Sequence, residues 1–340
     1  MTLYRVSGDS PIIKYLGEAA ENGKQVTVLV EVKARFDEEN NIYWAQELEK
    51  AGCHVIYGLV GLKTHCKLTL VVRREEDGIR RYMHMGTGNY NDSTARFYTD
   101  MGILTANAEM GIDASNIFNM LSGYSEPPNF YELIIAPMFL KPTLLDLIKD
   151  EAKAARKGKA ASIKMKMNSL SDVDMIEALY AASQAGVKIE LIVRGICCLK
   201  PGVEGLSENI EVHSIVDRLL EHSRIYEFYA NGAKLLFLSS ADLMHRNLKR
   251  RVELMFPVKD EAVKAKIERE FDGMFHDNVK TRKLGSDGVY QKLDKRGKPA
   301  LNIQETLIEQ ASRKMALSRT DSGRENRSFS PMTAFNEEGE

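Results

Sequence analysis

Little in the composition of this chain points to a specialised environment. Only four of its 340 residues are cysteines, and no two of them form a C-x-x-C pair. This excludes a disulfide framework and a cysteine zinc site, and favours a reducing compartment. Basic and acidic residues number 47 and 48, so the formal net charge is −1. That balance argues against nucleic acid as a partner, and any other anionic ligand requires a local basic cluster.

Long apolar runs are also missing. No stretch approaches the roughly 20 residues that cross a bilayer, and residues 1–20 lack the basic and apolar regions of a signal peptide. We expect a cytoplasmic protein, and a peripheral position at the inner face of the membrane stays open. The chain also lacks the G-x-x-x-x-G-K-[ST] phosphate loop and the glycine-rich loop of protein kinases. If it uses ATP, it does so through neither of those folds.

Helix and strand signals alternate along the chain, which predicts an α/β fold. In the first part, helices are expected over 11–22, 38–51 and 112–123, and strands over 25–32, 53–59, 66–73 and 80–85. After a polar segment with paired prolines (122–130) the alternation restarts, with strands over 132–137, 161–168 and 187–195 and helices over 139–157 and 172–185. Ser171 is expected to cap the last of these helices. We predict domains over 1–131 and 132–316, and a disordered tail over 317–340.

The two halves resemble each other in sequence. Residues 19–30 and 181–193 both predict a helix end, a glycine turn and a core strand. Farther on, THCKLTLVV in the first half corresponds to EHSRIYEFY in the second, which matches His65 with His222 and Lys67 with Arg224. A small-residue turn follows each, GTGN at 86–89 and SSAD at 239–242. The pattern predicts two α/β domains related by a pseudo-twofold duplication.

The matched histidines suggest a chemistry. His65 and Lys67 are two residues apart on a predicted strand, so their side chains share one face, and the same holds for His222 and Arg224. Two imidazoles that meet across a pseudo-twofold interface can act as nucleophile and as acid or base, because both titrate near neutral pH. Lys67 and Arg224 would hold the oxygens of a phosphoryl group. These residues predict a phosphoryl-transfer site.

Other residues are expected near that site. Thr87 and Asn89, in the GTGN turn, could donate hydrogen bonds to phosphate. Tyr98 and Asp100 follow in RFYTD, where the tyrosine either stacks on a base or packs in the core. The run HRNLKRRVE (245–253) is expected to be a solvated turn with a supporting electrostatic role.

Three arginines are further candidates. Arg35 and Arg194 follow predicted strands, where ligands gather in open α/β sheets, and Arg194 is expected to be equivalent to Arg35. Arg5 precedes the first helix. Each of them either binds an anion or forms a surface salt bridge. The other five histidines have no such partners and are expected to be structural.

Seven motifs in this order resemble polyphosphate kinase of the first type, whose catalytic half belongs to the phospholipase D-like superfamily: YRVSGDSPII, VKARFDEENNI, GLKTHCKL, GTGNYN, KMNSL, LIVRGIC and EHSRI. The resemblance covers residues 2–316. It implies reversible transfer of the ATP γ-phosphate to inorganic polyphosphate through a phosphohistidine. His65 would then be phosphorylated, and His222 would be the second catalytic histidine.

The resemblance also implies ligand contacts. Tyr98, Arg194 and His222 match ATP contacts of the family, and Asp100 is assigned to the same site. Arg5 and Arg35 match its magnesium–phosphate site. Because arginine has no free lone pair for a metal, we expect both to clamp phosphate oxygens that also carry Mg²⁺.

The implied partners are ATP or ADP and polyphosphate. Members of the family are about twice this length, with amino-terminal domains that help to hold the nucleotide and build a dimer. A homo-oligomer and a separate amino-terminal region are therefore both compatible with this chain.

Two alternatives remain. A phospholipase D-like phosphodiesterase could use the same paired histidines, although Arg224 replaces the usual second lysine. That class also carries an aspartate shortly after each histidine, and none lies within ten residues after His65 or His222. The other alternative is a non-catalytic fragment that binds polyphosphate.

Overall fold

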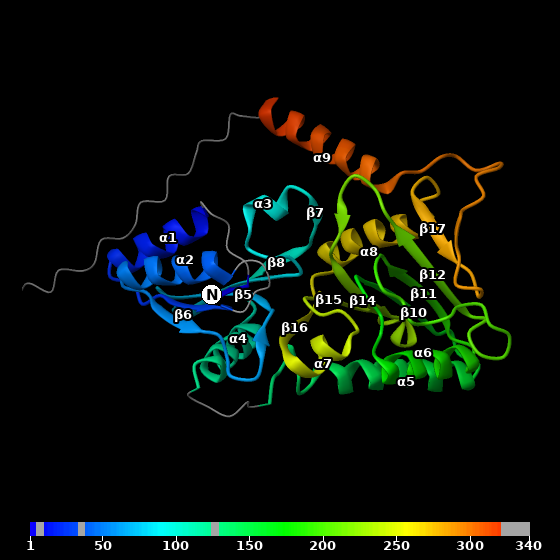
Figure 1. Cartoon of the computed structure of the whole chain (residues 1–340), viewed down its shortest axis with the longest axis horizontal. Helices are drawn as coiled ribbons and strands as arrows, with labels where there is room; N and C mark the ends of the chain where they lie inside the picture. The colour runs from blue at the N-terminus through cyan, green and yellow to red at the C-terminus, as the bar shows by residue number, and fades with distance from the viewer. Residues whose placement is uncertain (5–9, 33–37, 124–128, 321–340) are drawn as a thin grey trace, which may run out of the picture.

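The computed structural model describes residues 1–4, 10–32, 38–123 and 129–320 (Figure 1). Arg5 and Arg35 lie outside the described residues. The elements of the first half are β1 Thr2–Leu3, α1 Pro11–Glu21, β2 Thr27–Val30, α2 Glu38–Lys50, β3 His54–Tyr57, β4 Lys63–Thr64, β5 Lys67–Glu75, β6 Gly78–Gly86, α3 Asp92–Ala95, β7 Tyr98–Thr99, β8 Gly102–Thr105 and α4 Ala108–Leu121.

The elements of the second half follow the same α/β alternation at first and then become mainly antiparallel. They are β9 Ile134–Ala136, α5 Leu140–Arg156, β10 Ser162–Met167, α6 Val173–Gln184, β11 Lys188–Val193, β12 Ile210–Ile215, β13 Leu220–Glu221, β14 Arg224–Phe228, a 3-10 turn at Ala230–Gly232, β15 Leu235–Ser239, α7 His245–Arg250, β16 Arg251–Pro257, α8 Glu261–His276, β17 Thr281–Leu284, β18 Tyr290–Lys292 and α9 Ile303–Thr320.

A large mixed sheet organises the second half. Its strand order is β18-β17-β12-β11-β10-β14-β15-β16, and β10, β11 and β12 are parallel. Helices α5 and α6 cover one face and α8 the other (Figure 1). Successive strand residues serve the two faces, since Leu191 packs in the cluster with α5 and α6 and Ile192 in the cluster with α8.

The first half contains two smaller sheets. Strands β1, β2 and β3 are parallel and pack with α1 and α2, and β5, β6 and β8 form an antiparallel sheet that packs on α4. One apolar cluster runs across both halves, from Leu68 and Met85 to Ile192 and Phe271. The halves are therefore joined by a shared core.

Two very short strands cross between the halves. Strand β4 of the first half pairs in parallel with β16 of the second, and β13 of the second half pairs in parallel with β7 of the first. His65 directly follows β4 and His222 directly follows β13. The crossed strands thus bring the two histidine motifs to the seam between the halves.

Some helix and strand predictions need correction. Helix α6 begins after Asp172, whose side chain accepts from the N–H of Met175, so Ser171 is not its cap. The run 245–253 is not a solvated turn: it forms α7 and the start of β16, and Asn247, Leu248 and Glu253 are buried. The predicted tail starts too early, because α9 continues through residues 317–320; residues 321–340 lie outside the described part. In that part, no helix is both long and apolar enough to span a membrane.

Candidate active site

The backbone holds the two histidines in the same way. The N–H groups of His65 and Cys66 both donate to the carbonyl oxygen of Val252, at 2.9 Å. Those of His222 and Ser223 donate to the carbonyl oxygen of Thr99, at 3.2 and 2.9 Å. Each histidine is therefore fixed by a strand of the opposite half.

A carboxylate from the opposite half orients each imidazole. His65 Nδ1 lies 2.8 Å from Glu253 Oε2, and His222 Nδ1 lies 2.8 Å from Asp100 Oδ1. When a neutral imidazole donates its Nδ1–H to a carboxylate, the lone pair remains on Nε2. The arrangement leaves one basic nitrogen on each ring, and on His222 that nitrogen lies 3.1 Å from Arg224 Nη1.

The small-residue turns support these carboxylates equivalently. Thr87 Oγ1 donates to Asp100 Oδ1 at 2.6 Å, and Ser240 Oγ donates to Glu253 Oε2 at 2.5 Å. Thr87 therefore uses its hydroxyl proton within the protein. The matching contacts agree with the duplication inferred from the sequence and place Asp242 where the first half has Asn89.

Arg224 is fully engaged by the protein. Its Nε and Nη2 donate to the two oxygens of Asp242 at 3.1 and 3.3 Å, and its Nη1 donates to the carbonyl oxygens of Thr87 and His222 at 3.3 and 2.7 Å. The guanidinium thus joins the GTGN turn of the first half to the histidine motif of the second.

Lys67 has fewer partners. Its Nζ donates to the carbonyl oxygen of His65 and lies 5.5 Å from the ring centroid of Tyr4. The Tyr4 ring also packs edge-on against His65, with centroids 4.7 Å apart. An ammonium has three donors, so Lys67 retains more hydrogen-bonding capacity for a ligand than Arg224 does.

The residues expected to contact ATP lie along the same seam. The Tyr98 ring centroid is 4.8 Å from that of His222, and Arg194 Nε donates to Asn168 Oδ1 at 2.6 Å. Asn168 in turn donates to Asp242. Asn89 has a buried Oδ1 without a hydrogen-bond partner among the described residues. A cavity of about 340 Å³ opens beside Arg194, between Phe97 and residues 215–221.

The glutamate at the end of β2 occupies the place equivalent to Arg194. The register pairs Leu3 with Val30 in the first half and Met167 with Val193 in the second, so Glu31 corresponds to Arg194. Arg35, the residue expected to be equivalent to Arg194, lies outside the described residues.

Electrostatics link the two imidazoles. Burial, followed by the charges of Lys67 and other cations, holds the pKa of His65 well below its usual 6.5. Burial and the charge of Arg224 lower the pKa of His222 to about 4, with a smaller contribution from Lys67. Lys67 and Arg224 act on both rings. The histidines therefore share one cationic environment and are neutral at pH 7.

Two other groups titrate near neutral pH. Burial raises the pKa of Glu253 to about 7 and lowers the pKa of Lys67 to about 7. Asp242 stays ionised, because the charge and hydrogen bonds of Arg224 overcome the effect of burial and lower its pKa to about 2. The His65 arm is thus poised for proton movement, whereas Asp242 and Arg224 form a fixed ion pair.

Sequence reasoning missed several site residues. Glu253 lies 188 residues from His65, in a run interpreted as surface, although the apolar VELMF pattern that follows indicates a buried strand. Asp242 was visible within SSAD but had no assigned role. Arg251, whose charge lowers the pKa of His65, was also hidden in the 245–253 run.

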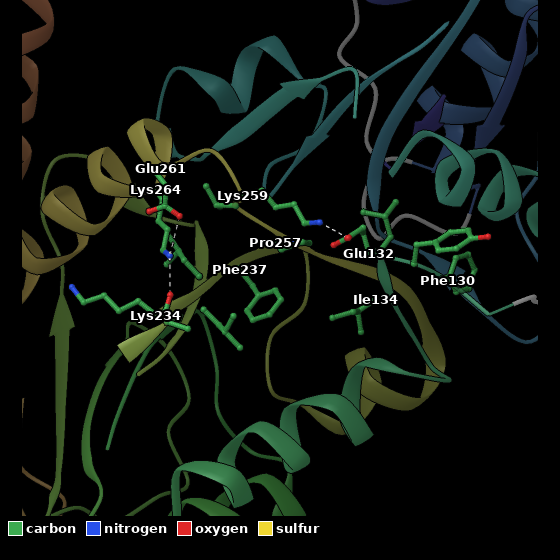
Figure 2. A pocket seen from close by; sticks show the side chains of 15 residues that line it. Phe130, Glu132, Ile134, Lys234, Phe237, Pro257, Lys259, Glu261 and Lys264 are labelled. Atoms are coloured by element: carbon green, nitrogen blue, oxygen red, sulfur yellow. Dashed lines mark hydrogen bonds and ion pairs between the residues drawn. The ribbon is translucent and has the colours of Figure 1, made fainter. Parts of the chain in front are cut away.

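The described residues include no group of three or more His, Cys, Asp or Glu side chains that could hold a metal ion. A second cavity has a volume of about 600 Å³ (Figure 2). It is bounded by residues 130–134, 233–237 and 257–264, and none of the candidate site residues lines it.

Known proteins share this chain's sequence and fold. The model of polyphosphate kinase C-terminal domain 1 matches residues 1–127, and that of polyphosphate kinase C-terminal domain 2 matches residues 133–304. Polyphosphate kinase of Lactiplantibacillus plantarum is 63% identical over 92% of this chain and 43% of its own length. The Bacillus cereus enzyme is 54% identical over 94% of this chain and 45% of its own length.

Solved structures agree. The crystal structure of polyphosphate kinase from Porphyromonas gingivalis superposes with a TM-score of 0.85 at 35% identity, covering 93% of this chain and 48% of that one. Phosphatidylserine synthase of Haemophilus influenzae, at 11% identity, covers 94% of this chain and 88% of its own with a TM-score of 0.57, which shows a shared fold only. The predicted α/β fold class is confirmed. The chain spans less than half the length of its curated relatives, and it belongs to the polyphosphate kinase family.

Proposed function

We propose that this chain carries the phosphoryl-transfer centre of a polyphosphate kinase, which moves the γ-phosphate of ATP reversibly to inorganic polyphosphate. The supporting observation is the pair of imidazoles oriented by crossed carboxylates, His65 with Glu253 and His222 with Asp100, in one cationic environment. The two proposed catalytic domains are residues 1–131 and 132–316.

In this proposal His65 is the nucleophile. Its Nε2 lone pair attacks the γ-phosphorus, the N–P bond forms, and the bond to the bridging oxygen breaks so that ADP leaves with that electron pair. The ring gains positive charge as the N–P bond forms. Glu253, hydrogen-bonded to Nδ1, stabilises that charge. A terminal oxygen of polyphosphate then attacks the phosphorus and releases neutral His65.

His222 assists at the oxygen that leaves or attacks. Its pKa of about 4 makes it neutral in the free site, but a bound polyanion stabilises the imidazolium and raises that pKa. Asp100 is a poor ATP contact, since a carboxylate repels phosphate. Instead, we propose that Asp100 orients His222 through the hydrogen bond to Nδ1.

Phosphate oxygens would be held mainly by Lys67, with Arg194, Arg251 and Arg224 supplying positive potential. The nucleotide would bind beside Tyr98, whose ring contacts His222, and in the cavity beside Arg194. The side-chain N–H of Asn89 would donate a hydrogen bond to a phosphate oxygen.

Mg²⁺ fits this site as part of the nucleotide substrate. The carboxylates of Asp242, Glu253 and Glu221 already hold Arg224, His65 and Lys166, respectively. An ion that arrives on ATP phosphates needs no protein carboxylate, and it offsets charge on the transferred group. We propose that Arg5 and Arg35 clamp the same phosphates, and that an amino-terminal region such as the relatives possess completes the nucleotide site.

Radiolabelling tests the nucleophile. With [γ-³²P]ATP and Mg²⁺, the chain should acquire acid-labile, base-stable label that is lost in His65→Ala. His245→Ala, a change at an exposed histidine of α7, is the matched control and should label normally. Label that survives His65→Ala would exclude this assignment. Hydrolysis of bis-(p-nitrophenyl) phosphate would favour a phosphodiesterase, and polyphosphate retention without ATP turnover would favour a binding fragment.

A further inference from the structure

The residue before His222 joins three elements inside the protein. Glu221 is buried, and its Oε2 accepts from Lys166 Nζ of β10 at 2.9 Å and from Thr99 Oγ1 of β7 at 3.0 Å. Its Oε1 accepts from Gln304 Nε2 of α9 at 2.6 Å. Lys166 also donates to Ser223 Oγ, on the other side of His222, at 2.5 Å. The histidine is thus flanked on both sides by one buried network.

Helix α9 enters this network through its first turn. Gln304 is 3% exposed, its Nε2 also donates to the carbonyl oxygen of Leu219, and its Oε1 accepts from the N–H of Leu219 at 2.8 Å. Asn302 Nδ2 donates to Asp217 Oδ2 at 2.8 Å. The segment 217–221 held in this way also forms a wall of the cavity beside Arg194.

The contacts of α9 with the apolar cluster are made near its start, where Leu307 also packs against that cluster. Residues 309–317 are exposed, whereas Ile303 is buried in the apolar cluster and its N–H donates to Asp277 Oδ2. Figure 1 shows α9 extending away from α8 above the first half. The helix is therefore anchored near residues 302–304, directly over the segment that leads to His222.

The His65 arm is held by a different network, in which the N–H of Thr64 donates to Glu31 Oε2 at 2.8 Å and Thr2 Oγ1 donates to the carbonyl oxygen of Cys66 at 2.8 Å. The strand registers make Thr2 the equivalent of Lys166, and Thr64, which precedes His65, corresponds to Glu221. Thr64 Oγ1 is buried without a hydrogen-bond partner among the described residues. Burying a lysine and a glutamate costs desolvation energy that the pair only partly recovers. In the second half this desolvation energy is spent on the Lys166–Glu221 pair, directly beside His222.

We propose that Gln304 and Glu221 are positioning residues for His222, and that the first turn of α9 sets the orientation of its imidazole and the wall of the adjacent cavity. The expected change in turnover when these residues are replaced rests on the proposed function. The expected change in the orientation of the His222 ring does not depend on it.

The test compares Gln304→Leu with Gln310→Leu, the same change at an exposed position of the same helix. Nitrogen-15 histidine spectra of the full chain are recorded, with His65 and His222 assigned from His65→Gln and His222→Gln. In Gln304→Leu the His222 ring signals and their titration should shift while those of His65 stay in place; Gln310→Leu should alter neither. Turnover should fall roughly 10- to 100-fold in Gln304→Leu and stay unchanged in Gln310→Leu. The reason is that a small displacement of the His222 imidazole from its position beside the reacting atoms slows the reaction by this much.

Unchanged His222 signals in Gln304→Leu, or equal shifts at both histidines, would overturn the proposal. If the wild-type chain shows no turnover even when the amino-terminal region is supplied, the proposed function fails while the spectra still decide this inference. A second set of variants guards against misfolding. Gln304→Glu opposes two carboxylates and should displace the His222 signals, and adding Glu221→Gln should return them toward wild type. If the His222 signals of the double variant stay displaced, the positioning role of Gln304 and Glu221 is also contradicted.

Discussion

At the scale of single residues, Arg224 and Lys67 occupy equivalent positions but have different neighbours. Arg224 has Asp242 beside it, whereas the equivalent neighbour of Lys67 is the neutral Asn89. Lys67 therefore has no ion pair as close as that of Arg224, although the charge of Glu253 acts on it. The second half presents an ion pair that holds the seam together. The two halves carry similar histidine motifs, and one difference between them is the acidic Asp242 in place of Asn89.

Asp242→Asn copies the first-half residue into the second half and tests this difference. The variant leaves the buried guanidinium of Arg224 without its counter-ion, so we expect the free energy of unfolding to fall by about 3–5 kcal/mol. Urea denaturation measures it. The control is Asp150→Asn at the exposed pair with Lys153, where the loss should stay within about 1 kcal/mol. Equal losses at the two sites would contradict the structural role of Asp242.

His222 should make stability depend on pH. Its pKa is about 4 in the fold and 6.5 when unperturbed, so between these values unfolding takes up a proton. Stability contributed by neutral His222 is complete above pH 6.5 and decreases as the pH falls toward 4, by roughly 3 kcal/mol in total. The difference between the urea midpoints of wild type and His222→Gln should change between pH 7 and pH 4, because only the wild type carries this titration. A constant difference would refute the low pKa.

At the scale of elements, helix α6 shows how a cap can also serve the core. Asp172 caps the helix and accepts from the buried Lys141 Nζ at 2.6 Å. Asp172→Ala should therefore cost about 2–3 kcal/mol, more than a cap alone. Asp260→Ala, at the exposed cap of α8, should cost about 1 kcal/mol. Ser171→Ala should change the unfolding free energy by less than about 0.5 kcal/mol, and a larger loss there would reinstate Ser171 as a cap.

Periodicity predicted the long elements because their own residues determine them. The expected helix over 11–22 appears as α1 and the one over 139–157 as α5. Strands β4, β7 and β13 are only two residues long, too short for any pattern to indicate. Their pairing depends on the opposite half, so the crossed arrangement could not be predicted from local sequence.

At the scale of the whole molecule, the duplication predicted that the two histidine motifs would meet, since matched motifs lie near the axis that relates the halves. It could not predict the carboxylates. Asp100 and His222 are 122 residues apart, and His65 and Glu253 are 188 apart. Nothing in the local sequence of either histidine indicates which acid reaches it.

The shared core and crossed strands predict that both histidines lose their surroundings together. In a urea titration followed by nitrogen-15 histidine spectra, the native ring signals of His65 and His222 should disappear at the same urea concentration, because neither half keeps its imidazole oriented alone. Separate midpoints for the two signals would show that the halves unfold independently.

The reciprocal exchange of β4 and β13 has a consequence for origin. In an isologous dimer, each contact between a residue of one unit and a residue of the other also occurs in reverse. The exchange of β4 and β13 has this reciprocal form. A one-lobed ancestor with this geometry could complete no site by itself and would have worked only as two associated copies. Joining two such copies in one polypeptide would allow each arm to differ from the other, as the arms do here at Asp242 and at the Lys166–Glu221 pair.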